Sequence, residues 1–286
     1  MKHLVGTQFL PVTECLNVPR QSPNLQECHF GHVYCRDIFI SKPIMPHARL
    51  KLLHVMLNQV ASMSFFGSIT LPSLSNLRIQ HYGLERLSLS SITSLFLRSA
   101  CNLERFSIEF PFDNADLIPC LEAIPSLSYL HLEMLGPDMG LTKKFVASLD
   151  PFSNSSRLLL PNLKYFEYKG PVLCDCRTIA DMLSRRWHLF DGKTSQSIFR
   201  VPKLRLANVF STVRYHVNRC ARSDGRTSQS IPTKLRLAKV LSTVQYRVTA
   251  DVQEELRNLS EEGMLVRIES LVPTTVSTSV SSGVRS

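Results

Sequence analysis

The stretch that decides the fold reads Leu71-Pro-Ser-Leu74-Ser-Asn-Leu77-Arg-Ile79. Its core is a phrase of three apolar residues, with two variable residues after the first and one variable residue after the second. Residues two apart on a strand face the same way, so Leu77 and Ile79 point into a core while Arg78 points out. Leu74 closes the turn that leads into the strand. The phrase therefore predicts a short strand with one buried face.

The same phrase recurs along the chain, which makes it a repeat. It opens at Leu25, Leu50, Leu74, Leu103, Leu127 and Leu163, often after Pro-Ser or Pro-Asn. The spacings are 25, 24, 29, 24 and 36 residues. Leucine-rich repeats run to roughly 20–29 residues, so the last spacing indicates one repeat with an insertion around 150–156. One unit is too small to bury its own apolar face, so neighbouring units must stack.

Segments between these strands have apolar residues three and four positions apart, a spacing that predicts helices. They are 91–99, 117–124, 178–186 and 251–260. Strands alternating with helices at this period predict an α/β leucine-rich-repeat solenoid of six or more units. We expect its parallel strands on a concave face and its helices on a convex face.

Positive charge is concentrated in one segment. The formal net charge is +10, and the segment from Arg177 to Arg247 alone contains 15 Lys and Arg against three acidic residues. Part of it is a tandem copy, because 191–198 is echoed by 224–231 and 203–213 by 234–244. Such a segment can bind nucleic acid or an acidic surface, or can simply be a solvated face.

Composition places the chain among ordinary globular proteins, with 44% hydrophobic and 20% charged residues. Eight scattered cysteines favour a reducing, intracellular compartment, cytoplasmic or nuclear. No run of about 18 apolar residues exists for a membrane span, so we expect no membrane association. The expected division is 1–20 lead-in, 21–190 repeat solenoid, 191–247 basic duplicated segment, 248–270 closing helix and strand, and 271–286 disordered Ser/Thr tail.

The sequence offers no convincing catalytic or metal motif. Cys28 and nearby histidines have zinc-friendly ligand types, but the repeat places Cys28 in the core. Residues 192–194 resemble the end of a phosphate-binding loop, yet Trp187 stands where its first glycine is required. Trp187 itself is expected in the core. We predict a chain that is not an enzyme, with no cofactor and no metal.

The outward strand positions form the expected partner surface. Aromatic and arginine side chains gathered on one rigid sheet can anchor a protein partner, although any such sheet must show polar residues outward. The residues predicted to bind are Arg78, Gln80, Arg105, Glu109, Tyr129, His131, Glu133, Tyr165 and Glu167. The same register adds Glu27, His29, Lys51, His54, Asn76, Ser107 and Lys169 to the row.

Three segments in order, 71–79, 101–109 and 121–132, resemble the repeat region of F-box proteins of mushroom-forming fungi, the basidiomycete type. Segments 182–187 and 256–268 fit the same pattern, and the resemblance covers roughly 20–270. It implies a protein-binding solenoid whose repeats recruit the substrate of a ubiquitin ligase complex. In that family an N-terminal F-box docks the ligase adaptor.

An F-box is not evident in this chain, because the first phrase already opens at Leu25 and leaves no room for a three-helix module. Binding of the ligase adaptor therefore stays open. Two alternatives also stay open at this point. The chain can be a binder of nucleic acid or of acidic surfaces through 177–247, or a fragment without function.

Overall fold

The computed structural model describes residues 2–6, 9–35, 45–81, 86–134, 140–152, 158–188, 206–212, 250–262 and 264–271. Within them the chain is an α/β fold built on one large parallel sheet, as the predicted class requires. The sheet contains β1 (His3–Gly6), β2 (Leu10–Pro11), β3 (Glu27–Tyr34), β5 (Leu52–Leu57), β7 (Asn76–His81), β8 (Arg105–Glu109), β9 (Tyr129–Glu133), β10 (Tyr165–Gly170), β11 (Leu206–Thr212) and β12 (Leu265–Leu271). Two short strands, β4 (Met45–Pro46) and β6 (Ile69–Thr70), pair separately.

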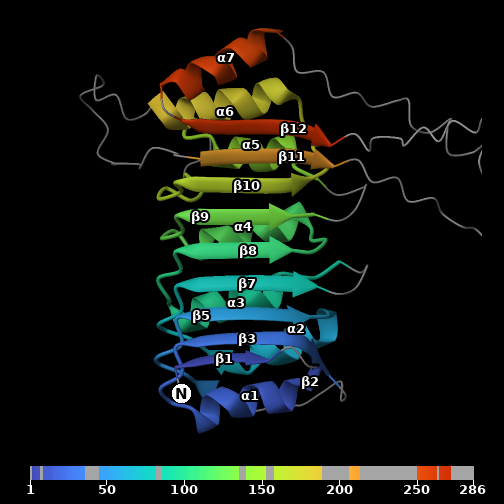
Figure 1. Ribbon diagram of the computed structural model, residues 1–286, viewed down its shortest axis with the longest axis vertical. Coiled ribbons are helices and arrows are strands. Elements are labelled where there is room, and N and C mark those ends of the chain that lie inside the picture. The colour runs from blue at the N-terminus through green and yellow to red at the C-terminus, as the bar shows by residue number, and fades with distance from the viewer. Residues whose placement is uncertain are drawn as a thin grey trace, which may run out of the picture.

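The strands follow one another across the sheet in the order β1-β3-β5-β7-β8-β9-β10-β11-β12, with β2 beside β3. Parallel neighbours need a crossover connection, and helices supply most of these crossovers. The helices are α1 (Val12–Gln21), α2 (Gln59–Gly67), α3 (Ser90–Ser99), α4 (Asn114–Glu122), α5 (Lys143–Leu149), α6 (Cys176–His188) and α7 (Ala250–Glu261). Figure 1 shows the strands as one tall stack with α2 to α5 behind it, so one face of the sheet is covered and the other is open.

Apolar residues fill the covered face in two aligned rows. Leu53, Leu77, Phe106, Leu130 and Phe166 are direct neighbours across five strands, and each is at most 1% exposed. A second row, from Val55 to Tyr168, is buried in the same way. The prediction that the last two apolar positions of each phrase point inward is confirmed.

Serine and asparagine side chains before the phrase tie each unit to the preceding one. The Ser73 hydroxyl donates to the Ala48 carbonyl at 2.6 Å, and the Ser126 hydroxyl to the Leu103 carbonyl at 2.8 Å. In the long unit the amide of Asn162 donates to the Pro125 carbonyl at 3.0 Å. These bonds satisfy carbonyls at the turns that no strand pairs, which explains why the phrase so often follows Pro-Ser or Pro-Asn.

Apart from the short strands β2, β4 and β6, two strands lie where the sequence predicted none. In the expected lead-in, β1 pairs with β3, and His3 lies opposite Glu27 just as Glu27 lies opposite Leu52 of β5. Gly6 stands opposite Phe30, so the apolar position that would reveal the phrase has no side chain. In the segment expected to be basic and duplicated, β11 comes from the first copy of the duplication and pairs with both β10 and β12.

The four predicted helices correspond to α3, α4, α6 and α7, with ends shifted by a few residues. The insertion expected around 150–156 lies mostly outside the described residues. So do the basic segment, except for β11, and the Ser/Thr tail beyond Leu271. The 36-residue spacing leaves the sheet unchanged, because Tyr165 pairs with Tyr129 in the register that Tyr129 keeps with Arg105.

Candidate functional site

The open face of β7 to β10 has its polar side chains in three lateral rows. Nearest the strand starts lie Asn76, Arg105, Tyr129 and Tyr165; the middle row is Arg78, Ser107, His131 and Glu167; nearest the strand ends lie Gln80, Glu109, Glu133 and Lys169. The nine residues predicted to bind a partner therefore share one surface. Their alignment follows from the strand register alone.

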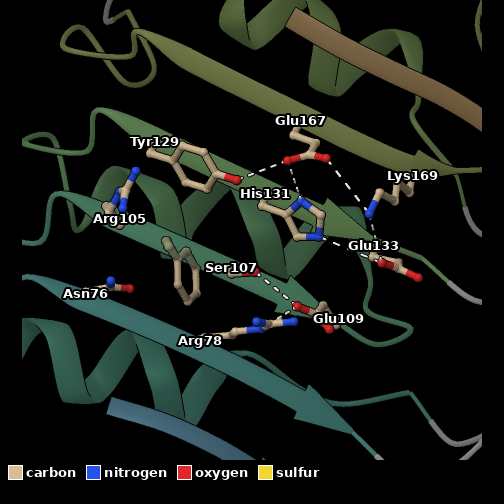
Figure 2. A pocket seen from close by; sticks show the side chains of 11 residues that line it. Asn76, Arg78, Arg105, Ser107, Glu109, Tyr129, His131, Glu133, Glu167 and Lys169 are labelled. Carbon is tan, nitrogen blue, oxygen red and sulfur yellow. Dashed lines mark hydrogen bonds and ion pairs between the residues drawn. The ribbon is translucent and has the colours of Figure 1, made fainter. Parts of the chain in front are cut away.

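A hollow of about 300 Å³ occupies the centre of this surface. Of the predicted residues, its lining includes Arg78, Arg105, Glu109, Tyr129, His131, Glu133 and Glu167. Figure 2 shows these side chains around the hollow, with Ser107 between them. The other two predicted residues flank it: Gln80 bonds to Glu109, and the ring of Tyr165 lies 6.3 Å from that of Tyr129.

One side of the hollow is organised by the Glu109 carboxylate. It accepts hydrogen bonds from Arg78 Nε and Gln80 Nε2, both at 2.6 Å, and from the Ser107 hydroxyl at 3.4 Å. Burial alone would raise the pKa of Glu109, but the bonds from Arg78 and Gln80 and the Arg78 charge outweigh it, so the pKa lies below its ordinary value. Glu109 is therefore ionised and fully engaged near neutral pH.

Gln80 extends this group toward the N-terminal strands. The Gln80 carbonyl oxygen lies 3.0 Å from His54 Nε2, and burial lowers the pKa of His54 below its ordinary value. A neutral imidazole at His54 can donate from Nε2 to this oxygen, which orients the Gln80 amide toward Glu109.

The other side of the hollow is organised by Glu167. Its Oε2 accepts a hydrogen bond from the Tyr129 hydroxyl at 3.0 Å and lies 3.2 Å from His131 Nδ1. Burial and the Glu167 charge raise the pKa of Tyr129 to about 12, so its hydroxyl stays a donor. His131 is buried, and its Nε2 faces Glu133 at 3.8 Å.

Lys169 completes this side. Its amine lies 3.8 Å from Glu133 Oε2 and 3.9 Å from Glu167 Oε1. Figure 2 marks both ion pairs with dashed lines. Both carboxylates on this side of the hollow therefore face positive or hydrogen-bonding groups of the chain itself.

Arg105 has a different environment. Its guanidinium carbon lies 5.0 Å from the centroid of the Tyr129 ring, a cation–π contact, and the residue is exposed. Within the described residues no carboxylate pairs with it. Asn76, its neighbour in the same row, makes no side-chain hydrogen bond to the described part of the chain.

Ser107, His131 and Glu167 are adjacent in the middle row, an order that invites comparison with a nucleophile, base and acid. The Ser107 hydroxyl, however, donates to Glu109, and His131 uses its two ring nitrogens toward Glu167 and Glu133. In the described residues no hydrogen bond joins Ser107 to His131. The arrangement lacks the base contact that activates a serine.

The register placed Ser107 in the row but gave no sign of its importance. Its significance is size: it is the shortest side chain among its neighbours in the three rows, and the hollow lies above it. Comparing side-chain lengths along the predicted rows could have found it. Phe106, which also borders the hollow, was predicted only as a core residue and is buried.

The other sequence candidates have structural positions. Cys28 is fully buried, and within the described ranges no group of three His, Cys, Asp or Glu side chains could hold a metal ion. Trp187 is buried, as expected, and its indole Nε1 donates to Glu262 at 2.7 Å. Residues 192–194 lie outside the described residues.

Comparisons of the chain with protein-family models, with curated proteins and with solved structures found no match. Among the helices that the structure describes, none has both the length and the apolar character needed to cross a bilayer.

Proposed function

We propose that this chain is a non-enzymatic protein-interaction module, a leucine-rich-repeat solenoid whose open, concave strand face holds a protein partner. The observation that carries the proposal is the hollow on that face, lined by two arginines, a tyrosine and three glutamates. Arginine and tyrosine are the residue types that most often anchor protein interfaces. The repeat phrase and its spacing support the solenoid class.

A narrower proposal follows from the family resemblance. In an F-box type ubiquitin ligase, the face of β7 to β10 would recognise the substrate, while the ligase adaptor would bind elsewhere. The resemblance in residues 71–132 supports this assignment, and these residues supply β7, β8 and β9.

The alternative of a nucleic-acid binder through 177–247 has weaker support. The arginines of its described part are engaged within the chain: Arg177 pairs with Asp181, Asp251 and Glu255, and Arg185 pairs with Asp150. Arg186 is buried. The other basic residues of this segment lie outside the described residues, so the alternative would rest on them alone.

Site-specific crosslinking tests the proposal. A photoreactive amino acid replaces Tyr165 on the open face, or the exposed Leu97 on α3 as a control. In a lysate of cells that express the chain, we expect a discrete crosslinked protein from position 165 only. That protein, once purified, should bind the wild-type chain and lose affinity for Tyr129→Ala.

Two results would oppose the proposal. Equal crosslinking from positions 165 and 97 would remove the open face as the binding surface. Nucleic acid as the sole ligand, released by salt, would favour the alternative, because phosphate contacts weaken steeply as ionic strength rises. Co-purification of a ligase adaptor with the bound protein would support the narrower proposal.

A further inference from the structure

The hollow exists because one short residue lies among long ones. Ser107 has Arg78 and His131 as lateral neighbours, with Arg105 and Glu109 before and after it on the same face of β8. A long side chain at this position would fill the space of about 300 Å³. That volume lies at the lower limit of the roughly 300–1,000 Å³ of small-molecule sites, and its lining is mostly polar, so it suits one or two side chains of a partner better than an organic ligand.

The acidic groups around the hollow already have partners. Glu109 accepts bonds from three side chains, and Glu167 accepts one from Tyr129 and lies beside His131. Glu133 lies between His131 and Lys169. These carboxylates therefore offer little to a positively charged ligand.

The hydrogen-bond donors of the first and middle rows are less engaged. Among the described residues Arg78 donates only from Nε, to Glu109, and its side chain is 48% exposed. Arg105 is stacked on Tyr129 and, among the described residues, faces no carboxylate. The side-chain amide of Asn76 lies beside Arg105 in the same row. The guanidinium and amide groups of these three lining residues leave N–H donors for a ligand in the hollow, and such groups bind oxyanions.

We propose that the hollow above Ser107 receives a carboxylate side chain, an Asp or Glu of a partner protein, bound by Arg78 and Arg105. The inference rests on the proposed function, in which the open face holds a protein partner. A planar carboxylate matches the two parallel N–H groups of a guanidinium. A phosphate dianion fits worse than a carboxylate. The three cationic side chains of the lining are matched by three carboxylates, and these would repel the second negative charge of the phosphate.

A peptide selection tests this assignment. A phage-displayed library of random dodecapeptides is selected on the immobilised full chain, and recovered peptides are synthesised with each Asp or Glu in turn replaced by Asn or Gln. We expect one acidic position whose amide replacement weakens binding at least about tenfold, the effect of losing a charge-assisted hydrogen bond. The chain variant Arg105→Ala should reduce that difference between acid and amide peptides.

Variants locate the site. Ser107→Tyr should abolish binding of these peptides, whereas Ser94→Tyr, at an exposed position on α3, should leave it unchanged. If Ser107→Tyr does not fold, Arg105→Glu, at an exposed position, replaces it as the test variant. Arg105→Glu should weaken the binding of acidic peptides more than the binding of their amide versions. Circular dichroism of each variant verifies that it is folded.

The outcomes separate this inference from the proposed function. If peptides bind and depend on Ser107, but amide replacement changes nothing, the carboxylate assignment is wrong while the binding face stands. If a phosphoserine version binds more tightly than the acidic peptide, phosphate replaces carboxylate as the ligand. If no recovered peptide depends on Ser107 or Arg105, both the hollow and the proposed face lose their support.

Discussion

The arginine side chains of the open face and the buried Arg186 of α6 differ in whether their N–H donors are open to solvent or bonded within the chain. On the open face, Arg78 and Arg105 keep donors directed to solvent beside a hollow. On α6, Arg186 is 1% exposed and donates from Nε, Nη1 and Nη2 to the carbonyls of Leu149, Leu160 and Leu159, at 2.6, 3.3 and 2.7 Å. In the sequence, positive charge is concentrated in the segment that begins at Arg177. The comparison shows that counting charges does not reveal which charges a partner can reach.

The sharpest test of this difference is the removal of Arg186. Arg186→Met removes the Arg186 donor from each of three buried carbonyls. We therefore expect the free energy of unfolding, measured in urea, to fall by about 3 kcal/mol. Burial lowers the pKa of Arg186 to about 10, which reflects how completely water is excluded from it. Arg185→Met is the matched control, because the Arg185 side chain is 48% exposed. Its replacement should lower the free energy of unfolding by less than about 1 kcal/mol. Equal losses in the two variants would contradict a special role for Arg186.

Trp187 gives the next largest effect in the same region. Trp187→Phe removes the donor to Glu262 Oε2 and part of the packed ring, so we expect a loss of about 1–2 kcal/mol in denaturant unfolding. Glu262→Gln keeps an acceptor for the indole and should cost less. A Trp187→Phe variant as stable as the wild type would show that this contact does not hold α7 to α6.

On the open face, Glu109 should make stability depend on pH. Its pKa in the folded chain is lower than its ordinary value, so its ionised form stabilises the fold above the ordinary carboxylate range. That contribution is lost as pH falls from the ordinary value through the lowered one. We expect the stability difference between wild type and Glu109→Gln to shrink between about pH 6 and 3, measured by urea titration at each pH. A constant difference would show that Glu109 is not the titrating group.

The smallest expected effect is that of Arg105. Because it is exposed and has no carboxylate partner among the described residues, Arg105→Ala should change stability by less than about 0.5 kcal/mol. Thermal unfolding monitored by circular dichroism measures the change. A loss comparable with that of Arg186→Met would mean that Arg105 serves the fold and not a partner.

The strand register of the middle of the molecule could be predicted because the phrase has a fixed period of two at its apolar end. Placing Leu77 and Ile79 inward also placed Arg78 outward, and the other phrases aligned in the same way. The expected row on the open face follows from this geometry except at Lys51, because Leu52, and not Lys51, pairs with Asn76. The strand register does not depend on loop length, so the 36-residue spacing leaves it unchanged.

Other features were beyond this pattern. The phrase does not reveal β1, because Gly6 stands where it requires an apolar side chain. It does not reveal β11 either, because Ala207 pairs with Phe166 at a position where the six phrases have a larger residue. The burial of Arg186 depends on carbonyls of residues 26 to 37 positions away, brought near by tertiary packing. Which carboxylate pairs with which base on the open face likewise depends on side-chain rotamers, about which a strand pattern says nothing.

Backbone hydrogen bonds between neighbouring strands run along the long axis of the stack, from β1 to β12 (Figure 1). A tensile force applied between the two ends of the stack acts on all strand pairs in series, so the weakest pair opens first, whereas a force along the strands would shear a whole ladder at once. The molecule should therefore be mechanically soft in its long direction and stiff across it. A partner that contacts all four strands from β7 to β10 would resist their separation. Single-molecule pulling should therefore record a higher force for the opening of these strands when the partner is bound.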